Sequence, residues 1–159
     1  MPVKQYAFIS QWLVDAPVQP VWESIYESEQ WPLWWKGVIQ VTETLKGDEN
    51  GIGSIRQYKM RSPMLYTLSF NIHLTERVDY VKLVGDASGE LKGTGAWYFE
   101  ERKTKTLVQC HWHVSTTIRW MNAFSYLLRP LFEYNHAAVM RNGAISLAKK
   151  LNTQVEIIS

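Results

Sequence analysis

The stretch APVQPVWESIY at residues 16–26, followed by WPLWW at residues 31–35, decides how this sequence folds. Apolar residues of the first segment recur at helical spacing: Val18, Val21, Trp22, Ile25 and Tyr26. We expect Asp15 to cap this helix and Pro17 to lie near its first turn. Pro32 prevents a continuous helix, so residues 29–35 are predicted to form a short second helical turn with its tryptophans facing inward. So dense an aromatic cluster is rarely left in water, which points toward the enclosure of an apolar ligand.

Seven segments of the chain have the alternation typical of strands. They cover residues 4–14, 38–45, 54–61, 66–77, 80–87, 90–101 and 106–117. The turns after residue 37 are short, so neighbouring strands should pair antiparallel. Residues 121–151 return to helical spacing, with a break expected at Pro130. The sequence therefore predicts an α+β fold: a curved antiparallel sheet of about seven strands around a long C-terminal helix, with two short helices after strand one.

Details of the terminal helix and of two glycines refine this prediction. The helix should bury a stripe of residues: Leu131, Met140, Ala144, Leu147 and Leu151. Gly143 inside the helix would allow close approach to a strand or to the front helices. Gly93 or Gly95 could mark a bulge that changes which side of a strand faces the core.

Composition excludes several classes of protein. The chain has 159 residues and 46% hydrophobic content, which fits one domain spanning residues 1–159. Seventeen basic and 15 acidic residues give a net charge of +2 without a basic stripe, so no nucleic-acid partner is expected. The single Cys110 fits a reducing cytoplasm. The sequence has no apolar signal core and no apolar run of roughly 18 residues, so we expect a cytoplasmic protein without an integral membrane segment. We expect it to be a monomer or a homodimer.

Four local sequences carry a family resemblance. They are DAPVQPVW at residues 15–22, WPLWW at 31–35, GIGS at 51–54 and GTGAW at 93–97. With the order of the predicted elements, they make the whole chain resemble the helix-grip superfamily of START-like and polyketide cyclase/dehydrase (SRPBCC) proteins. The resemblance implies a deep cavity between the concave face of the sheet and the terminal helix. It says little about chemistry, because the superfamily includes lipid carriers, hormone receptors, pathogenesis-related proteins, cyclases and oxygenase subunits.

The strand patterns independently predict apolar walls for such a cavity. Leu68, Phe70, Ile72 and Leu74 share one face of a strand, as do Val108, Cys110, Trp112 and Val114 of another. Arg56 and Tyr58 lie on the same face of their predicted strand as Ser54 and Met60. If that face is concave, Arg56 places a permanent cation in an apolar pocket and needs an anion from the protein or the ligand. If the face is solvated at a sheet edge, arginine is ordinary there.

We expect a ligand to contact aromatic residues near the sheet, the polar pair on the third strand, and the inner side of the terminal helix. The predicted ligand-binding residues are Trp35, Arg56, Tyr58, Phe70, Trp97, Trp112, Phe132, His136 and Met140. Core packing should instead claim Trp12 and Trp22.

Candidates for catalysis are fewer. Glu133 and His136 lie three apart on the terminal helix beside Tyr134, so an acid/base pair at the pocket mouth is conceivable, although helix surfaces carry such pairs routinely. His111 and His113 share a strand face and could resemble a metal pair. The opposite face carries the apolar residues, however, so both histidines should lie on the convex side of the sheet. We therefore expect neither a metal nor a cofactor. Cys110 should be an inert buried thiol.

Three functions remain open. The first is a non-catalytic protein that binds or transports a hydrophobic small molecule, either a lipid or a polyketide-like aromatic, in the enclosed cavity. The second is a cyclase/dehydratase-type enzyme acting on a polyketide-like substrate, with Glu133, His136, Tyr58 or Arg56 assisting proton transfer or enolate stabilisation. The third is a partner-binding module, which would place an exposed apolar patch at the cavity mouth. Nothing in the sequence requires catalysis.

Overall fold

The computed structural model describes residues 5–61 and 67–159. In chain order its elements are β1 (Tyr6–Val14), α1 (Val18–Tyr26), η1 (Ser28–Gln30), α2 (Trp31–Trp34), β2 (Val38–Leu45), β3 (Ile55–Arg61), β4 (Thr67–Val78), β5 (Lys82–Gly89), β6 (Leu91–Arg102), β7 (Lys105–Thr116), α3 (Arg119–Ala123), α4 (Ser125–Lys150) and β8 (Val155–Ile157). The strands form one sheet in the order β2-β3-β4-β5-β6-β7-β1-β8. Every pairing is antiparallel. The predicted α+β architecture is confirmed.

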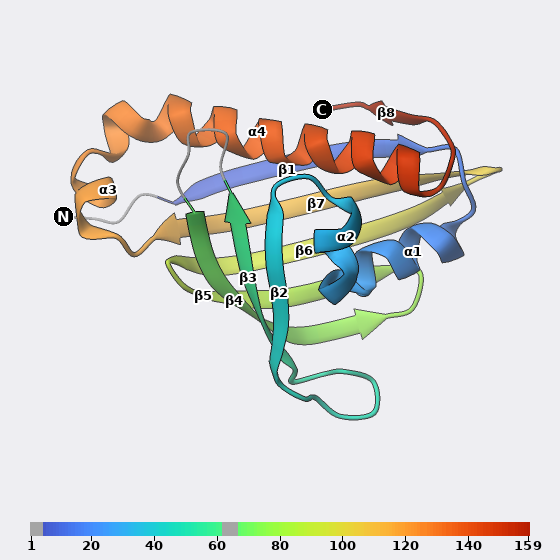
Figure 1. Ribbon diagram of the computed structural model, residues 1–159, viewed down its shortest axis with the longest axis horizontal. Coiled ribbons are helices and arrows are strands. Elements are labelled where there is room, and N and C mark those ends of the chain that lie inside the picture. The colour runs from blue at the N-terminus through green and yellow to red at the C-terminus, as the bar shows by residue number, and fades with distance from the viewer. Residues whose placement is uncertain (1–4, 62–66) are drawn as a thin grey trace.

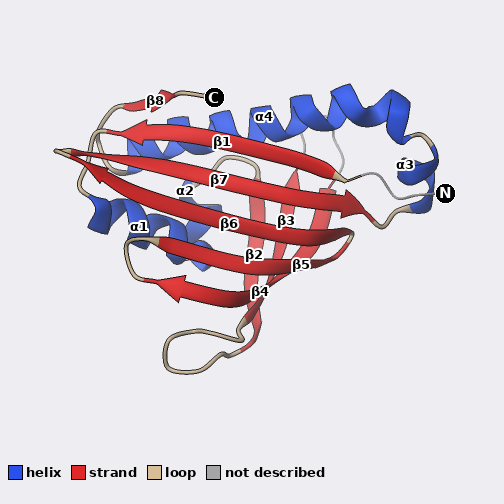
Figure 2. Ribbon diagram, turned by 180° about the vertical axis from the view of Figure 1, so that it is seen from behind, coloured by secondary structure: helices blue, strands red, loops and turns tan. Residues whose placement is uncertain are grey.

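The sheet is strongly curved, and the long helix α4 closes its concave side. Strands β2 and β3 run across the direction of β1 and β7 (Figure 1). Helices α1 and α2 lie near one end of the molecule, whereas α3 and the start of α4 lie at the other (Figures 1 and 2). Because the sheet bends around the space under α4, side chains of alternate positions on most strands point into a common interior.

The front helices follow the prediction except at the cap. Helix α1 begins at Val18 with Pro17 as its N-cap, and no side chain caps it. The predicted cap at Asp15 is wrong because that residue instead belongs to the end of the sheet: its N–H donates to the carbonyl of Gln154 at 2.9 Å. The second helical segment exists as η1 and α2, with Pro32 in the first turn of α2, where a missing N–H costs little.

The terminal segment differs from the prediction in where it breaks. Helix α4 is continuous through Pro130, and the interruption lies at Phe124, between α3 and α4. Pro130 is the sixth residue of α4, so its missing N–H removes one helical hydrogen bond without ending the helix. The sequence also gave no indication of β8, which pairs with residues 12–14 of β1.

The register of the sheet settles the question about the two glycines. Gly93 and Gly95 pair regularly with Val114 and Trp112, so no bulge changes the face of β6. The irregularities lie elsewhere, in the β2–β3 pairing and between Leu74 and Glu76 of β4. The first residues of two predicted strands, Lys4 and Tyr66, lie outside the described residues.

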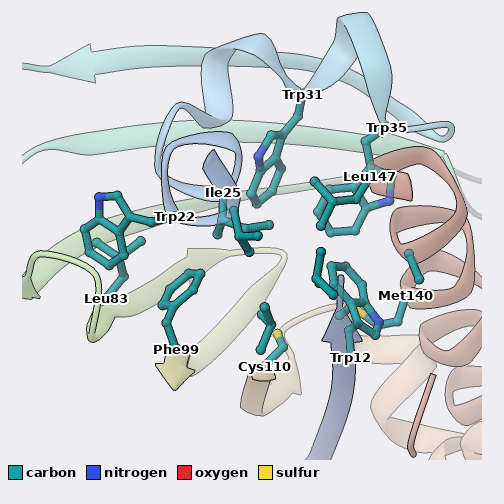
Figure 3. Packing of buried hydrophobic residues seen from close by; sticks show 14 of the residues in the cluster. Trp12, Trp22, Ile25, Trp31, Trp35, Leu83, Phe99, Cys110, Met140 and Leu147 are labelled. Atoms are coloured by element: carbon teal, nitrogen blue, oxygen red, sulfur yellow. The ribbon is translucent and has the colours of Figure 1, made fainter. Parts of the chain in front are cut away.

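The core joins α4 to the front of the chain. Trp12 and Leu147 are fully buried, and Trp12 and Trp35 lie against α4 near Met140 and Leu147 (Figure 3). Gly143 makes this contact possible: a Cβ there would lie 2.5 Å from Cζ2 of Trp35. The indole Nε1 of Trp35 also donates to the carbonyl of Val139 at 3.1 Å. The predicted stripe is therefore buried at its centre, while Leu131 and Leu151 are half-buried.

Among the helices of residues 5–61 and 67–159, none combines the length and the apolar character that crossing a membrane requires.

Candidate functional site

A cavity of about 250 Å³ lies between the concave face of the sheet and α4. Four strands supply most of its sheet wall: β3, β4, β6 and β7. The helical wall comes from the front helices and from the inner side of α4. We call this space the main cavity.

The predicted inward faces of the strands are the faces that form its wall. Leu68, Phe70, Ile72 and Leu74 of β4 all line the main cavity. On β7 the lining residues are Cys110, Trp112, Val114 and Thr116, whereas Val108 is buried in the core beside them.

All nine residues predicted to contact a ligand line the main cavity: Trp35, Arg56, Tyr58, Phe70, Trp97, Trp112, Phe132, His136 and Met140. The fold thus brings together residues separated by about 100 positions in the chain. Their role in binding stays a prediction.

Aromatic rings in contact form much of the wall. Trp31 lies 4.7 Å from Trp35 and 5.5 Å from Tyr58, measured between ring centroids. Tyr58 stacks on Phe70 at 5.4 Å, and Phe70 meets Trp112 edge-on at 5.6 Å. These offset and edge-to-face arrangements suit aromatic pairs and give the wall a defined shape.

Gly95 allows one of these rings to lie flat on the sheet. A Cβ at this position would lie 2.1 Å from Cζ3 of Trp112. Any larger residue would force the Trp112 ring to move, so the glycine sets the position of an aromatic wall residue.

The polar part of the wall centres on Arg56. Its Nη1 donates to the carbonyl of Tyr26 at 2.7 Å and to Oγ of Ser28 at 2.8 Å. Its Nε is buried and has no hydrogen-bond partner among the described residues. Within residues 5–61 and 67–159, Arg56 also forms no ion pair. The guanidinium therefore keeps a positive charge beside a largely apolar cavity, while its Nε is enclosed by protein atoms.

Two hydroxyl groups extend this polar point. The hydroxyls of Ser28 and Tyr58 are 2.8 Å apart. Burial raises the pKa of Tyr58, although its contacts with Ser28 and Arg56 act in the opposite direction. Tyr58 is thus a neutral phenol at pH 7, able to donate or accept a hydrogen bond.

Glu133 and His136 both line a second pocket, beside β1 and α4, but only His136 also lines the main cavity, so their acid/base role stays a prediction. His136 lines the main cavity and stacks on Phe8 at 4.4 Å between ring centroids. Burial lowers the pKa of His136 to about 4, so the imidazole is neutral at pH 7. Glu133 does not line the main cavity: it is exposed and pairs with Arg129, one turn earlier, at 3.1 Å. The i,i+4 geometry of the helix surface thus takes Glu133 away from the interior.

The two histidines and the cysteine of β7 lie on the sides of the sheet that the alternation of the strand predicts. His113 is exposed, and Nε2 of His111 lies 3.0 Å from Oε1 of Gln109 on the convex side. In the described part of the chain, no three His, Cys, Asp or Glu residues are grouped as a metal site would require. Cys110 is buried, and burial raises the pKa of its thiol to about 12, which keeps it protonated and unreactive.

Sequence reasoning missed two groups that line the main cavity. Ser28 lies between Glu27 and Glu29, a context typical of a solvated turn, so nothing in the sequence marks it as the partner of Arg56 and Tyr58. Tyr6 and Phe8 were within reach of prediction, because they share the strand face of the buried Trp12.

Comparison with models of protein families gave no match, and none was found among curated proteins either. Solved structures do match. The chain is 12% identical to the Zhui aromatase/cyclase from Streptomyces sp. R1128, with a TM-score of 0.72 over 92% of this chain and 93% of the other. A START superfamily protein from Mycobacterium smegmatis is 11% identical, with a TM-score of 0.63 over 86% of this chain and 93% of the other.

A third similar structure is longer than this chain. The di-domain ARO/CYC StfQ from the steffimycin biosynthetic pathway is 15% identical, with a TM-score of 0.65. The match covers 93% of this chain but 52% of StfQ, so this chain spans about half the length of that protein. At these identities the likeness concerns the backbone arrangement alone. The chain has the helix-grip fold shared by START-like proteins and polyketide aromatase/cyclases.

Proposed function

We propose that this protein binds a compact hydrophobic small molecule in the main cavity and orients it by one polar contact with Arg56. The observation that carries the proposal is the composition of the wall: aromatic and aliphatic side chains surround the guanidinium of Arg56, which forms no ion pair among the described residues. Apolar burial would supply the affinity, at about 25 cal/mol per Å² of apolar surface removed from water. The guanidinium would select the orientation.

The size of the cavity favours one kind of ligand. A volume of about 250 Å³ lies near the lower end of the roughly 300–1,000 Å³ typical of small-molecule sites. This space suits a molecule of a few fused rings or a short acyl chain better than a two-chain phospholipid. The aromatic wall favours a planar ring system, and the positive charge of Arg56 favours a carbonyl, phenolate or carboxylate at one end.

The first experiment is native mass spectrometry of the purified protein compared with its denatured mass, followed by extraction and identification of any molecule carried along. The second is titration with a panel of fluorescent hydrophobic probes. A retained or bound aromatic or acyl compound is the expected result. An empty protein that also binds none of the probes would contradict the proposal.

Two matched variants locate the bound molecule. Trp112→Leu removes a ring from the cavity wall, and we expect it to weaken probe binding about tenfold. Tyr98→Leu changes a ring on the next strand that packs against His111 on the convex side, so probe affinity should stay within about twofold. Equal losses in both variants would indicate a general loss of structure, and thermal melts would identify that case.

A catalytic function of the cyclase/dehydratase type is the second candidate. The contact of Arg56, Ser28 and Tyr58 favours it, because a cation and two hydroxyls at one point can stabilise an enolate or position a carbonyl. Incubation with a linear polyketide-like substrate should then give a cyclised product faster than buffer alone. Tyr58→Phe would lower that rate in an enzyme, whereas in a binding protein both variant and parent would leave the product distribution unchanged.

A further inference from the structure

The end of the molecule formed by α3 and the start of α4 exposes large apolar side chains to solvent. Trp120 is 57% exposed, Phe124 55% and Leu127 73%. We name the α3–α4 patch by its exposed members, which are Trp120, Phe124, Tyr126, Leu127 and Tyr134. Five such residues lie within 15 positions, whereas the exposed groups at residues 78–81 and 157–158 hold three and two. A concentration of this kind marks an interaction surface.

The cause is visible in the sequence of the helix. From residue 126 to 132 the chain reads YLLRPLF, so apolar residues lie on all sides of the first two turns of α4. The inner side forms part of the cavity wall, because Phe132 of α4 and Met121 of α3 line the main cavity. The outer side has no covering element among the described residues, since Leu127 and Tyr134, seven residues apart, share an exposed helix face.

The charges around the patch identify the kind of surface that it fits. Arg119, Arg129 and Glu133 lie within the α3–α4 segment, and Glu133 pairs with Arg129. Arg119 is exposed and forms no ion pair among the described residues, so it carries the net positive charge of the patch. Tryptophan and tyrosine favour the boundary between water and hydrocarbon, and arginine beside them favours anionic headgroups.

We propose that the α3–α4 patch docks the protein onto an anionic lipid bilayer, with Trp120, Phe124 and Leu127 entering the interface and Arg119 contacting the headgroups. Both figures place α3 and the start of α4 together at one end of the molecule, so the two segments can touch one plane (Figures 1 and 2). The same segments form part of the cavity wall through Met121 and Phe132. An apolar molecule would then pass between bilayer and main cavity over a short distance. This docking is independent of the proposed cavity ligand.

The test is flotation of the protein with vesicles, measured without any cavity ligand. Vesicles of equal parts phosphatidylglycerol and phosphatidylcholine should carry the wild type upward, and vesicles of phosphatidylcholine alone should carry less. The double variant Trp120→Ser, Leu127→Ser should lower the partition coefficient about tenfold or more, since two interfacial anchors are lost. Leu33→Ser is the matched control, because Leu33 is 81% exposed on α2, away from the patch, and should leave the coefficient within about twofold.

A charge variant keeps the test decisive if the double variant fails to fold. Arg119→Glu should lower binding to the anionic vesicles severalfold and leave the weaker binding to phosphatidylcholine unchanged. The proposal is overturned if the wild type does not float with anionic vesicles, or if the patch variants float as well as the wild type. It is also overturned if sedimentation velocity shows a homodimer that the double variant dissociates, because the patch would then be the contact between two copies.

Discussion

The two halves of α4 use apolar residues in opposite ways. In the C-terminal half, Leu147 is fully buried and Gly143 lets the helix backbone approach Trp35, whose indole bonds the carbonyl of Val139. In the N-terminal half, Leu127 and Tyr134 are more than half exposed. One half therefore holds the helix to the sheet, while the other forms a cavity wall on one side and an apolar surface on the other. Apolar content alone does not distinguish a structural segment from a functional one.

The largest expected difference between the halves is in stability. Leu147→Ala removes a fully buried side chain and should lower the free energy of unfolding by about 3 kcal/mol, within the ~2–5 kcal/mol typical of such cavities. Leu127→Ala makes the same chemical change on the same helix at an exposed site, and its effect should stay within about 0.5 kcal/mol. Urea denaturation of both variants measures the contrast. Similar losses in the two would mean that the N-terminal half is also structural.

A second variant tests the close approach in the C-terminal half. Gly143→Val places side-chain atoms where Trp35 and Trp12 already lie, since a Cβ would be 2.5 Å from Trp35 and 2.9 Å from Trp12. We expect a loss of about 2 kcal/mol in unfolding free energy, the size typical of overpacking, with a changed near-ultraviolet circular dichroism spectrum from the displaced indoles. A spectrum and stability equal to those of the wild type would show that α4 can shift away from the tryptophans at no cost.

The N-terminal half should respond to pH instead. His136 has a pKa lowered by burial to about 4, against 6.5 ordinarily, so between these values the unfolded chain binds a proton that the folded protein does not. Stability is therefore lost as the pH falls from about 6.5 toward 4, and integrating the shift gives on the order of 2 kcal/mol between pH 7 and pH 5. The measurement is urea denaturation at both pH values for the wild type and for His136→Gln.

The variant supplies the control for that measurement. Carboxylates titrate in both proteins, so the difference between their pH dependences isolates His136. His113→Gln, at an exposed histidine on the convex side, should follow the wild type. If His136→Gln loses as much stability as the wild type on acidification, the imidazole is solvated in solution rather than buried.

The sequence predicted the architecture and the cavity wall because both depend on periodicity. Alternation along β4 and β7 indicated the inward faces, and the regular pairing of Gly93 and Gly95 kept those faces in register. What it missed depends on contacts between distant segments. β8 and the role of Ser28 both arise from tertiary neighbours: β8 needs the edge of β1, and Ser28 needs Arg56 and Tyr58 brought from β3.

The pairing of β1 has a consequence for how the protein is made. Tyr6 pairs with Val114 on β7, and Trp12 pairs with Ile157 on β8, so the strand that leaves the ribosome early finds its neighbours only after about 100 further residues. At about 5–20 residues per second, β1 waits roughly 5–20 seconds for β7. During that time its apolar face, with Trp12 and Val14, has no native cover. The strand that pairs with both β7 and β8 in the finished protein is thus the one that a nascent chain leaves unpaired longest, and a chaperone that holds early-emerging apolar segments would act on it first.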